Sequence, residues 1–250
     1  MKIEKVLQDS LQGASDVARR SCLKAQELER GGDYEGARAA MEGLWHRVGE
    51  RPILNGLTES VAGEVLQRAG ALSGYIGSKQ QLAGAQEFAK DLISESIDIF
   101  DRLGLASQAA EARADIAVCY WREGSFDEAR VILREALKGF TDEDITEKAI
   151  TLYRLAMVEL SSDHLHDAHR VLAECSPLYA SIDDASLKGR FHHQLALVLR
   201  KLGTAMRRED YFDQALVEYS AANFYWEQSG SLRYCAGVQN NMKPVQIKVQ

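Results

Sequence analysis

The stretch "ARADIAVCYWREGSFDEARVILREALKGF", from Ala112 to Phe140, decides the fold. Small residues recur in it at Ala117, Ala129 and Ala136, and large apolar residues stand three and four positions away from them. This spacing is typical of amphipathic helices. Small residues at a helix interface let two antiparallel helices approach closely, while the larger ones fill the gaps between them. The stretch therefore predicts a pair of packed helices.

The turn between these two helices can also be located in the sequence. Gly124 is expected to end the first helix, because glycine adopts the left-handed conformation that often follows a helix. Ser125, with Glu128 three positions later, has the form of a capping box for the second helix. The sequence thus predicts a helix-turn-helix hairpin with its turn at Gly124 and Ser125.

The same skeleton recurs along the chain. Its marker is a small residue in the second helix of each pair, and consecutive markers are separated by 52, 40, 39 and 47 residues. The markers are Ala37, Ala89, Ala129, Ala168 and Ala215. A single hairpin cannot bury its own apolar faces, so we expect the copies to stack on one another.

The skeleton Leu-Ala…Gly-x-Tyr/Phe-x-x-Ala…Ala resembles the tetratricopeptide repeat (TPR), over about four fifths of the chain. The long period is similar to that of kinesin light chains and of the sensor arms of bacterial regulators. The resemblance implies an all-α fold, a right-handed superhelical solenoid of stacked antiparallel helix pairs, which binds peptides or proteins on its concave face. We predict a solenoid of about five and a half hairpins over residues 1–242, followed by a non-repeat tail at 243–250.

Two hairpins are expected to be longer than the others. The marker positions of their two helices, Gly70 to Ala89 and Ala196 to Ala215, lie 19 residues apart, against 12 from Ala117 to Ala129. Seven extra residues are about two helical turns, so a helix can lengthen without rotating its apolar face. Residues 46–60, which contain Pro52 and an Asn-Gly pair, are predicted to connect two hairpins.

Composition places the chain among folded proteins of the cytoplasm. It has 250 residues, of which 46% are apolar, and no apolar run long enough for a signal sequence or a membrane helix. Its formal charge of −7 disfavours nucleic acid as a partner. The four cysteines lie far apart, so we expect reduced thiols that pack as small apolar groups.

Motifs of enzymes are missing from the sequence. It has no phosphate-binding loop, no dinucleotide fingerprint, no HExxH and no GxSxG. We therefore predict a non-enzymatic protein without catalytic residues, cofactor or metal. The nearest approach to a metal site is His164, His166 and His169, but no carboxylate or cysteine is spaced to complete the set of ligands.

Residues 188–208 give the strongest indication of a binding surface, because they contain six basic residues, two histidines and no acid. As one helix they would bury a stripe formed by Phe191, Leu195, Val198, Leu199, Leu202 and Met206. Alignment with the TPR resemblance places other residues of the first helices on the concave groove. These groove residues are Trp121, Arg122, Tyr153, Met157, Arg190, His193, Leu197, Arg200 and Lys201.

The groove residues suit a protein or peptide that carries acidic residues or a free carboxylate. Three other interpretations stay open. The basic stripe can be an ordinary solvated face that nearby acids compensate. The chain can be the sensor or regulatory arm of a signalling or transcriptional regulator. Nucleic-acid binding is a weaker interpretation, which a salt titration would test. We assign the remaining large aromatic side chains, Trp45, Phe88, Phe100, Tyr219, Phe224 and Trp226, to core packing.

The end of the chain departs from the repeat. Residues 229–242 match the opening of one more hairpin, and the resemblance places Asn240 and Asn241 on the groove. Pro244 then disfavours helix at Lys243. The last residues, "VQIKVQ", alternate apolar and polar positions and supply no second helix. We expect this tail to be foreign to the repeat, as at the interruption of a longer array.

Overall fold

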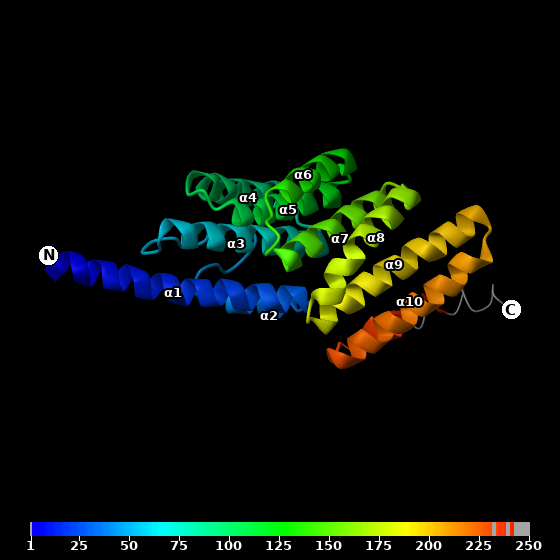
Figure 1. Cartoon of the computed structure of the whole chain (residues 1–250). Helices are drawn as coiled ribbons and strands as arrows, with labels where there is room; N and C mark the ends of the chain where they lie inside the picture. The colour runs from blue at the N-terminus through cyan, green and yellow to red at the C-terminus, as the bar shows by residue number, and fades with distance from the viewer. Residues whose placement is uncertain (1, 232–233, 239–240, 243–250) are drawn as a thin grey trace. The chain divides into compact units, whose positions relative to one another are not determined.

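The computed structural model describes residues 2–231, 234–238 and 241–242, with the backbone alone for residues 2–10. Within these ranges the chain is all-α and contains no strand, as predicted (Figure 1). No helix in this part of the chain is long and apolar enough to cross a membrane. The predicted tail at 243–250 and Asn240 lie outside the described residues.

The helices form successive hairpins, each made of a first and a second helix (Figure 1). The first helices are α1 (Lys2–Arg30), α3 (Glu59–Lys79), α5 (Ala106–Glu123), α7 (Ile145–Ser161) and α9 (Ala185–Met206). The second helices are α2 (Tyr34–Ala40), α4 (Ala85–Arg102), α6 (Phe126–Lys138), α8 (Leu165–Ser181) and α10 (Glu209–Gln228). The predicted connector at 46–60 lies between α2 and α3 except for its last two residues, Glu59 and Ser60, which begin α3.

The five marker alanines of the repeat are confirmed as packing positions. Each lies in the second helix of its hairpin and has no exposed surface. Full burial follows from their size, because a larger side chain would hold the two helices apart. The spacing of small residues thus located all five second helices.

The predicted extra length of the hairpins α3–α4 and α9–α10 is confirmed against the hairpins α5–α6 and α7–α8. The first helices of the two long hairpins, α3 and α9, have 21 and 22 residues, whereas α5 has 18 and α7 has 17. Their second helices, α4 and α10, have 18 and 20 residues, against 13 in α6 and 17 in α8. The additional residues therefore extend helices and do not form loops.

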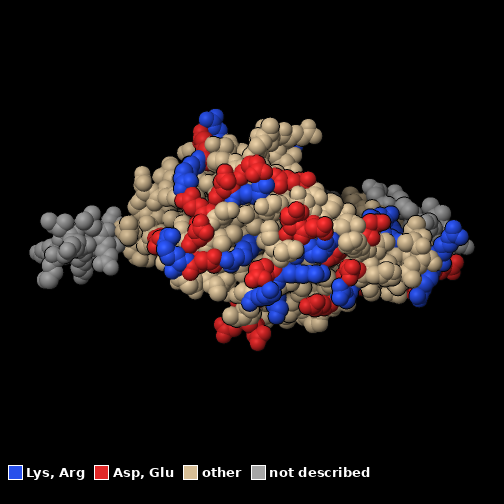
Figure 2. Space-filling model, turned by 90° about the horizontal axis from the view of Figure 1, so that it is seen from above, with Lys and Arg blue, Asp and Glu red and all other residues tan. Residues whose placement is uncertain are grey.

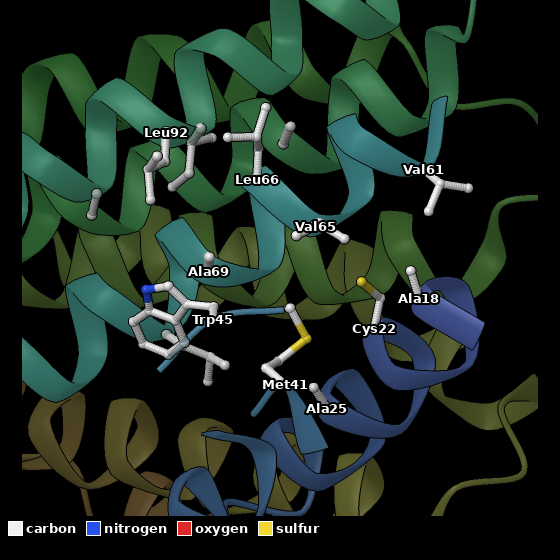
Figure 3. Close-up of a cluster of buried hydrophobic side chains, with 14 of the residues drawn as sticks. Ala18, Cys22, Ala25, Met41, Trp45, Val61, Val65, Leu66, Ala69 and Leu92 are labelled. Atoms are coloured by element: carbon white, nitrogen blue, oxygen red, sulfur yellow. The ribbon is translucent and has the colours of Figure 1, made fainter. Parts of the chain in front are cut away.

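The chain divides into two compact units, a first unit at Met1–Thr141 and a second unit at Asp142–Gln250. The first unit contains the three hairpins from α1 to α6. Its core gathers Cys22 of α1, Trp45, and Val65, Leu66 and further residues of α3 (Figure 3). The division into 1–242 and 243–250 stays a prediction.

The second unit contains the hairpins α7–α8 and α9–α10 and the helical residues that follow. Residues 234–238 are helical, and Cys235 and Val238 are buried against α9 and α10. In this described part, the chain does begin one more helix after α10, as the repeat pattern predicts. All four cysteines are buried and none forms a disulfide, in agreement with the expected role as apolar packing groups.

Three local expectations were wrong. Gly124 does end α5 in the left-handed region, at φ 85°, and Ser125 is the N-cap of α6, but the Ser125 side chain forms no capping hydrogen bond. Met206, expected in the buried stripe of α9, is 41% exposed because it lies in the last turn of the helix. Phe224, expected in the core, is 55% exposed on α10.

Gly189 allows a close contact between α9 and the Trp226 ring of α10. A Cβ atom at this position would lie 2.6 Å from Cδ1 and Nε1 of Trp226, which is too close for an unshifted ring. We expect Gly189→Ala to lower the free energy of unfolding by about 1–3 kcal/mol, as overpacking does. Urea unfolding measures this change. Gly237→Ala is the matched control, since its Cβ would meet nothing within 4 Å, and an equal effect of both substitutions would contradict the packing argument.

Candidate functional site

Three first-helix segments of the second unit meet on one face. Tyr153 comes from α7, Arg190 from α9 and Tyr234 from the helical residues after α10, and the charge of Arg190 acts on the Tyr153 phenol. Burial raises the pKa of Tyr153, and the nearby guanidinium offsets only part of this effect. The phenol therefore keeps its proton at neutral pH. It offers a hydrogen-bond donor beside a cation.

His193 lies at the centre of this face. Its ring centroid is 5.9 Å from that of Tyr219 and 5.3 Å from that of Trp226, both on α10. Nδ2 of Asn241 lies 3.2 Å from its Nε2 atom. Burial first, and the charge of Arg200 second, lower the pKa of His193 to about 4. The imidazole is therefore neutral at pH 7, and its Nε2 atom can accept the hydrogen bond from the Asn241 amide.

The structure thus brings together Tyr153, Arg190, His193 and Asn241 of the predicted groove residues. We call these four the first-helix face of the second unit. Met157 of α7 is half-buried, and Leu197 of α9 packs against the core with only part of its side chain accessible. Asn240 lies outside the described residues.

Sequence reasoning missed three contributors to this face. Tyr219 and Trp226 were assigned to the core alone; they are buried there, but they also flank His193. Tyr234 stacks on Trp226 with a centroid distance of 5.0 Å. The two α10 residues are seven positions apart and so share one side of the helix, which is the signal that could have found them. Nothing in the sequence pattern singled out Tyr234.

The basic residues of α9 divide into two groups. Within residues 188–208, Arg208 at the start of α10 forms an ion pair with Asp210, His192 of α9 pairs with Glu218, and Lys188 lies over the ring of Tyr225. These contacts agree with the solvated-face interpretation. Arg200 and Lys201 differ, because no carboxylate of the described residues forms an ion pair with either. The Nε atom of Arg200 is moreover buried without a hydrogen-bond partner in this part of the chain.

Arg200 and Lys201 line a hollow of about 310 Å³. The other lining residues are Thr204 and Ala205 of α9, and Asp163 and Leu165 at the turn between α7 and α8. All of them belong to the second unit. The hollow therefore combines two cations, one anion, a hydroxyl group and an apolar wall.

Trp121 and Arg122 belong to the first unit. The guanidinium of Arg122 lies 5.3 Å from the ring centroid of Tyr75 on α3, and this ring stacks on Tyr34. The Trp121 side chain is half-buried near the end of α5. The single groove that the sequence predicts from Trp121 to Asn241 runs through both units, and its continuity stays a prediction.

The expectation that no carboxylate stands near the histidines of residues 164–169 is wrong. Ligand atoms of Glu159, His164 and Asp167 lie within 4.8 Å of one another, and Nδ1 of His164 is 3.1 Å from the buried carboxylate of Glu159. These are residue types that bind metals. Asp167, however, already pairs with Arg170 at 2.6 Å. We interpret the group as the set of polar contacts that joins the last turn of α7 to the first turn of α8.

Charged side chains of both signs are interspersed on the face that Figure 2 shows, among the residues that it colours. Such a surface favours local recognition of charge over a broad attraction of nucleic acid.

Comparison with known proteins identifies the fold. No protein-family model matches the sequence, and no curated protein matches it either. Among solved structures, PlcR of Bacillus thuringiensis, in complex with the peptide PapR7 and DNA, has a TM-score of 0.68 at 12% identity, covering 88% of this chain and 73% of PlcR. The Rap conjugation gene regulator of plasmid pLS20, in complex with the Phr* peptide, has a TM-score of 0.52 at 14% identity.

The Rap match covers 86% of this chain and 60% of the Rap chain. BtubC from P. vanneervenii has a TM-score of 0.50 at 15% identity, covering 96% of this chain and 91% of BtubC. Identities this low show the fold alone. The chain has a TPR-like helical-repeat fold, as its sequence pattern predicts.

Proposed function

We propose that the chain is a non-enzymatic module that binds a peptide or a segment of a protein on the first-helix face of the second unit. The observation that carries this proposal is the convergence of Tyr153, Arg190, His193 and Asn241 from three successive first-helix segments. Aromatic rings beside an arginine are the residue types that most often dominate binding energy. Two solved structures with this fold, those of PlcR and of the pLS20 Rap protein, contain bound peptides.

The chemistry of the face suits an extended peptide. The Tyr153 hydroxyl and the Asn241 amide can hydrogen-bond to a peptide backbone, while the partly accessible ring of Tyr234, which stacks on buried Trp226, provides apolar surface nearby. Neutral His193, whose Nε2 atom accepts from Asn241, adds its Nδ1–H group as a donor without a charge. A peptide bound in this way would be recognised through its backbone and through apolar anchors.

Acidic groups of the partner are the finer part of the proposal. Arg200 and Lys201 carry two positive charges that no described carboxylate neutralises by an ion pair. A carboxylate of the partner can accept hydrogen bonds from a guanidinium in a bidentate geometry. We therefore propose that acidic residues or a free carboxylate of the partner bind there.

The test is capture of partners with the purified chain, followed by mass spectrometry, and then a binding assay with the partner identified. We expect the charge reversal Arg200→Glu with Lys201→Glu to weaken binding about tenfold or more, because attraction becomes repulsion. Arg170→Glu with Arg207→Glu makes the same change in net charge at exposed residues outside the hollow. Equal affinity of both double variants would remove Arg200 and Lys201 from the binding surface.

A second candidate function is that of a regulatory arm, in which occupancy of the face changes the assembly of an attached effector. The likeness to PlcR and to the pLS20 regulator favours this candidate, because the PlcR structure contains both a peptide and DNA. Light scattering after size-exclusion chromatography, with and without the captured partner, tests it. We expect the partner to change the oligomeric state of the chain. If the number of chains in the particle stays the same, the regulatory-arm candidate is contradicted and the proposal of partner binding is unaffected.

A further inference from the structure

We infer that the hollow at the end of α9 takes the C-terminal residue of a peptide, one that carries both a free α-carboxylate and a basic side chain. The inference rests on the proposed function, since it assigns the residue that ends the bound peptide. It also predicts that peptides with a basic residue at the C-terminus are preferred, which the first-helix face alone does not predict.

The carboxylate would bind at Arg200 and Lys201. Arg200 lines the hollow, its guanidinium also interacts with the Tyr219 phenol, and its buried Nε–H group has no hydrogen-bond partner among the described residues. Lys201 lines the same hollow, and so does Thr204, whose hydroxyl group donates to the backbone oxygen of Arg200 at 3.1 Å. An α-carboxylate offers two oxygen atoms, which suit a guanidinium together with an ammonium group.

The basic side chain would bind at Asp163. This carboxylate lines the hollow with Arg200 and Lys201, yet it forms no ion pair with either of them in the described structure. The negative charge of Asp163 and the positive charges of Arg200 and Lys201 therefore belong to residues of the same hollow, more than 4.0 Å apart. A ligand with one charge of each sign is complementary to this arrangement, whereas a ligand with an anion alone leaves Asp163 opposed to a second negative charge.

The remaining walls and the size fit one residue with a long aliphatic stem. Leu165 and Ala205 provide apolar surface between the charged groups. The hollow of about 310 Å³ lies at the lower end of the range for small-molecule pockets, about 300–1,000 Å³. It therefore has room for one terminal residue, from which the rest of a peptide can continue into solvent. Lysine and arginine have stems that pack on apolar surface while the charged end reaches a partner.

The experiment titrates the full chain with small probes, followed by amide chemical shifts in NMR. The probe is Nα-acetyl-L-arginine, compared with its C-terminal amide, which lacks the carboxylate, and with Nα-acetyl-L-norleucine, which lacks the cation. We expect saturable binding of the arginine probe with shifts at the residues that line the hollow. Loss of the carboxylate should weaken it about tenfold, and loss of the cation about threefold.

Two variants separate the two contacts. Asp163→Asn is isosteric, and asparagine tolerates the left-handed backbone at this position, φ 61°. It should abolish the preference for the arginine probe over the norleucine probe. Lys201→Gln should weaken both of these probes. Asp213→Asn and Arg207→Gln, at exposed residues outside the hollow, are the controls and should leave every affinity unchanged.

Equal binding of the arginine and norleucine probes to the unmodified chain would show an anion site only and would overturn the inference. Absence of saturable binding of any probe would overturn it as well. Either result leaves the proposed function open to its own test, because Tyr153→Ala and Asn241→Ala probe partner capture on the first-helix face. These two residues do not line the hollow.

Discussion

Replacement of Arg68 by alanine is expected to lower the free energy of unfolding of the first unit by about 3–5 kcal/mol, the range for removing one partner from a buried ion pair. Arg68 lies in the middle of α3, and only 8% of its side-chain surface is exposed. Its Nη1 atom donates to Glu29 of α1 at 2.7 Å, and its Nη2 atom lies 3.5 Å from Glu111 of α5. One guanidinium thus joins three first helices.

The electrostatics of Arg68 explain the size of this effect. Burial by itself lowers the pKa of the guanidinium, but the carboxylates of Glu29, Asp115 and Glu111 outweigh it, so the net pKa is raised. The charged form is therefore favoured in the folded unit. Removing it leaves carboxylates in a poorly solvated place without their shared cation, which costs more than the cavity alone.

Urea unfolding of the variant, followed by fluorescence of buried Trp45, measures the change. The matched control is Arg19→Ala. Arg19 pairs with Glu64 of α3 at 3.1 Å, but 43% of its side-chain surface is exposed, so its loss should cost at most about 1 kcal/mol. If the two variants unfold at the same urea concentration, Arg68 does not hold the first helices together in the way its contacts indicate.

The repeat could be predicted because its signals are local. The marker alanines are buried in every second helix since only a small side chain fits between packed helices, and a small residue is visible in the sequence itself. The added helical turns of α3 and α9 follow from the same spacing. The capping hydrogen bond of Ser125 was predicted wrongly, because a local pattern is not sufficient for it. A sequence pattern gives the position of an N-cap, but a hydrogen bond also depends on the backbone angles at Ser125.

Contacts between distant residues could not be predicted in this way. Arg68 and Glu29 are 39 residues apart, and nothing in the α3 sequence distinguishes a buried arginine from a solvated one. The same holds for the candidate site. The resemblance placed His193 on a groove, but only the structure shows that its Nε2 atom meets Asn241, 48 residues away. A repeat pattern predicts which side of each helix faces its neighbours. It does not predict which charged or polar side chain of a neighbouring helix lies opposite a given residue.

The second unit is expected to lose stability when the pH falls from about 6.5 to about 4, because burial lowers the pKa of His193 and, in the same direction, the pKa of His169. The ordinary pKa of histidine is about 6.5, and in the folded unit burial and the charge of Arg200 lower it to about 4. Between these values the unfolded chain binds a proton at His193 and the folded chain does not, so protonation favours unfolding. The stabilisation is complete above pH 6.5 and is lost as the pH falls through 4.

The neighbours of His193 support this sign. Arg200 on the same helix is positively charged, and the groups that face the ring from the other elements are neutral: Tyr219 and Trp226 from α10, and the Asn241 amide. None of these can stabilise an imidazolium ion by an ion pair. A shift from 6.5 to about 4 corresponds to a loss of up to about 3 kcal/mol. Protonation of Nε2 also removes the acceptor that the Asn241 amide uses in the folded unit.

The loss of stability is measured by urea unfolding at pH 7 and at pH 4.5. Unfolding is followed by a signal of the second unit, such as the fluorescence of Trp226. An NMR titration of the imidazole signals gives the pKa of His193 directly. His193→Gln keeps a neutral polar side chain at every pH, so this variant should lose less stability between the two pH values than the unmodified chain. His46→Gln, at an exposed histidine of the first unit, should keep the full loss. If the His193→Gln variant loses as much stability between the two pH values as the unmodified chain, the titrating group lies elsewhere. If the NMR titration gives His193 a pKa near 6.5, the ring is solvated and its contact with Asn241 opens readily.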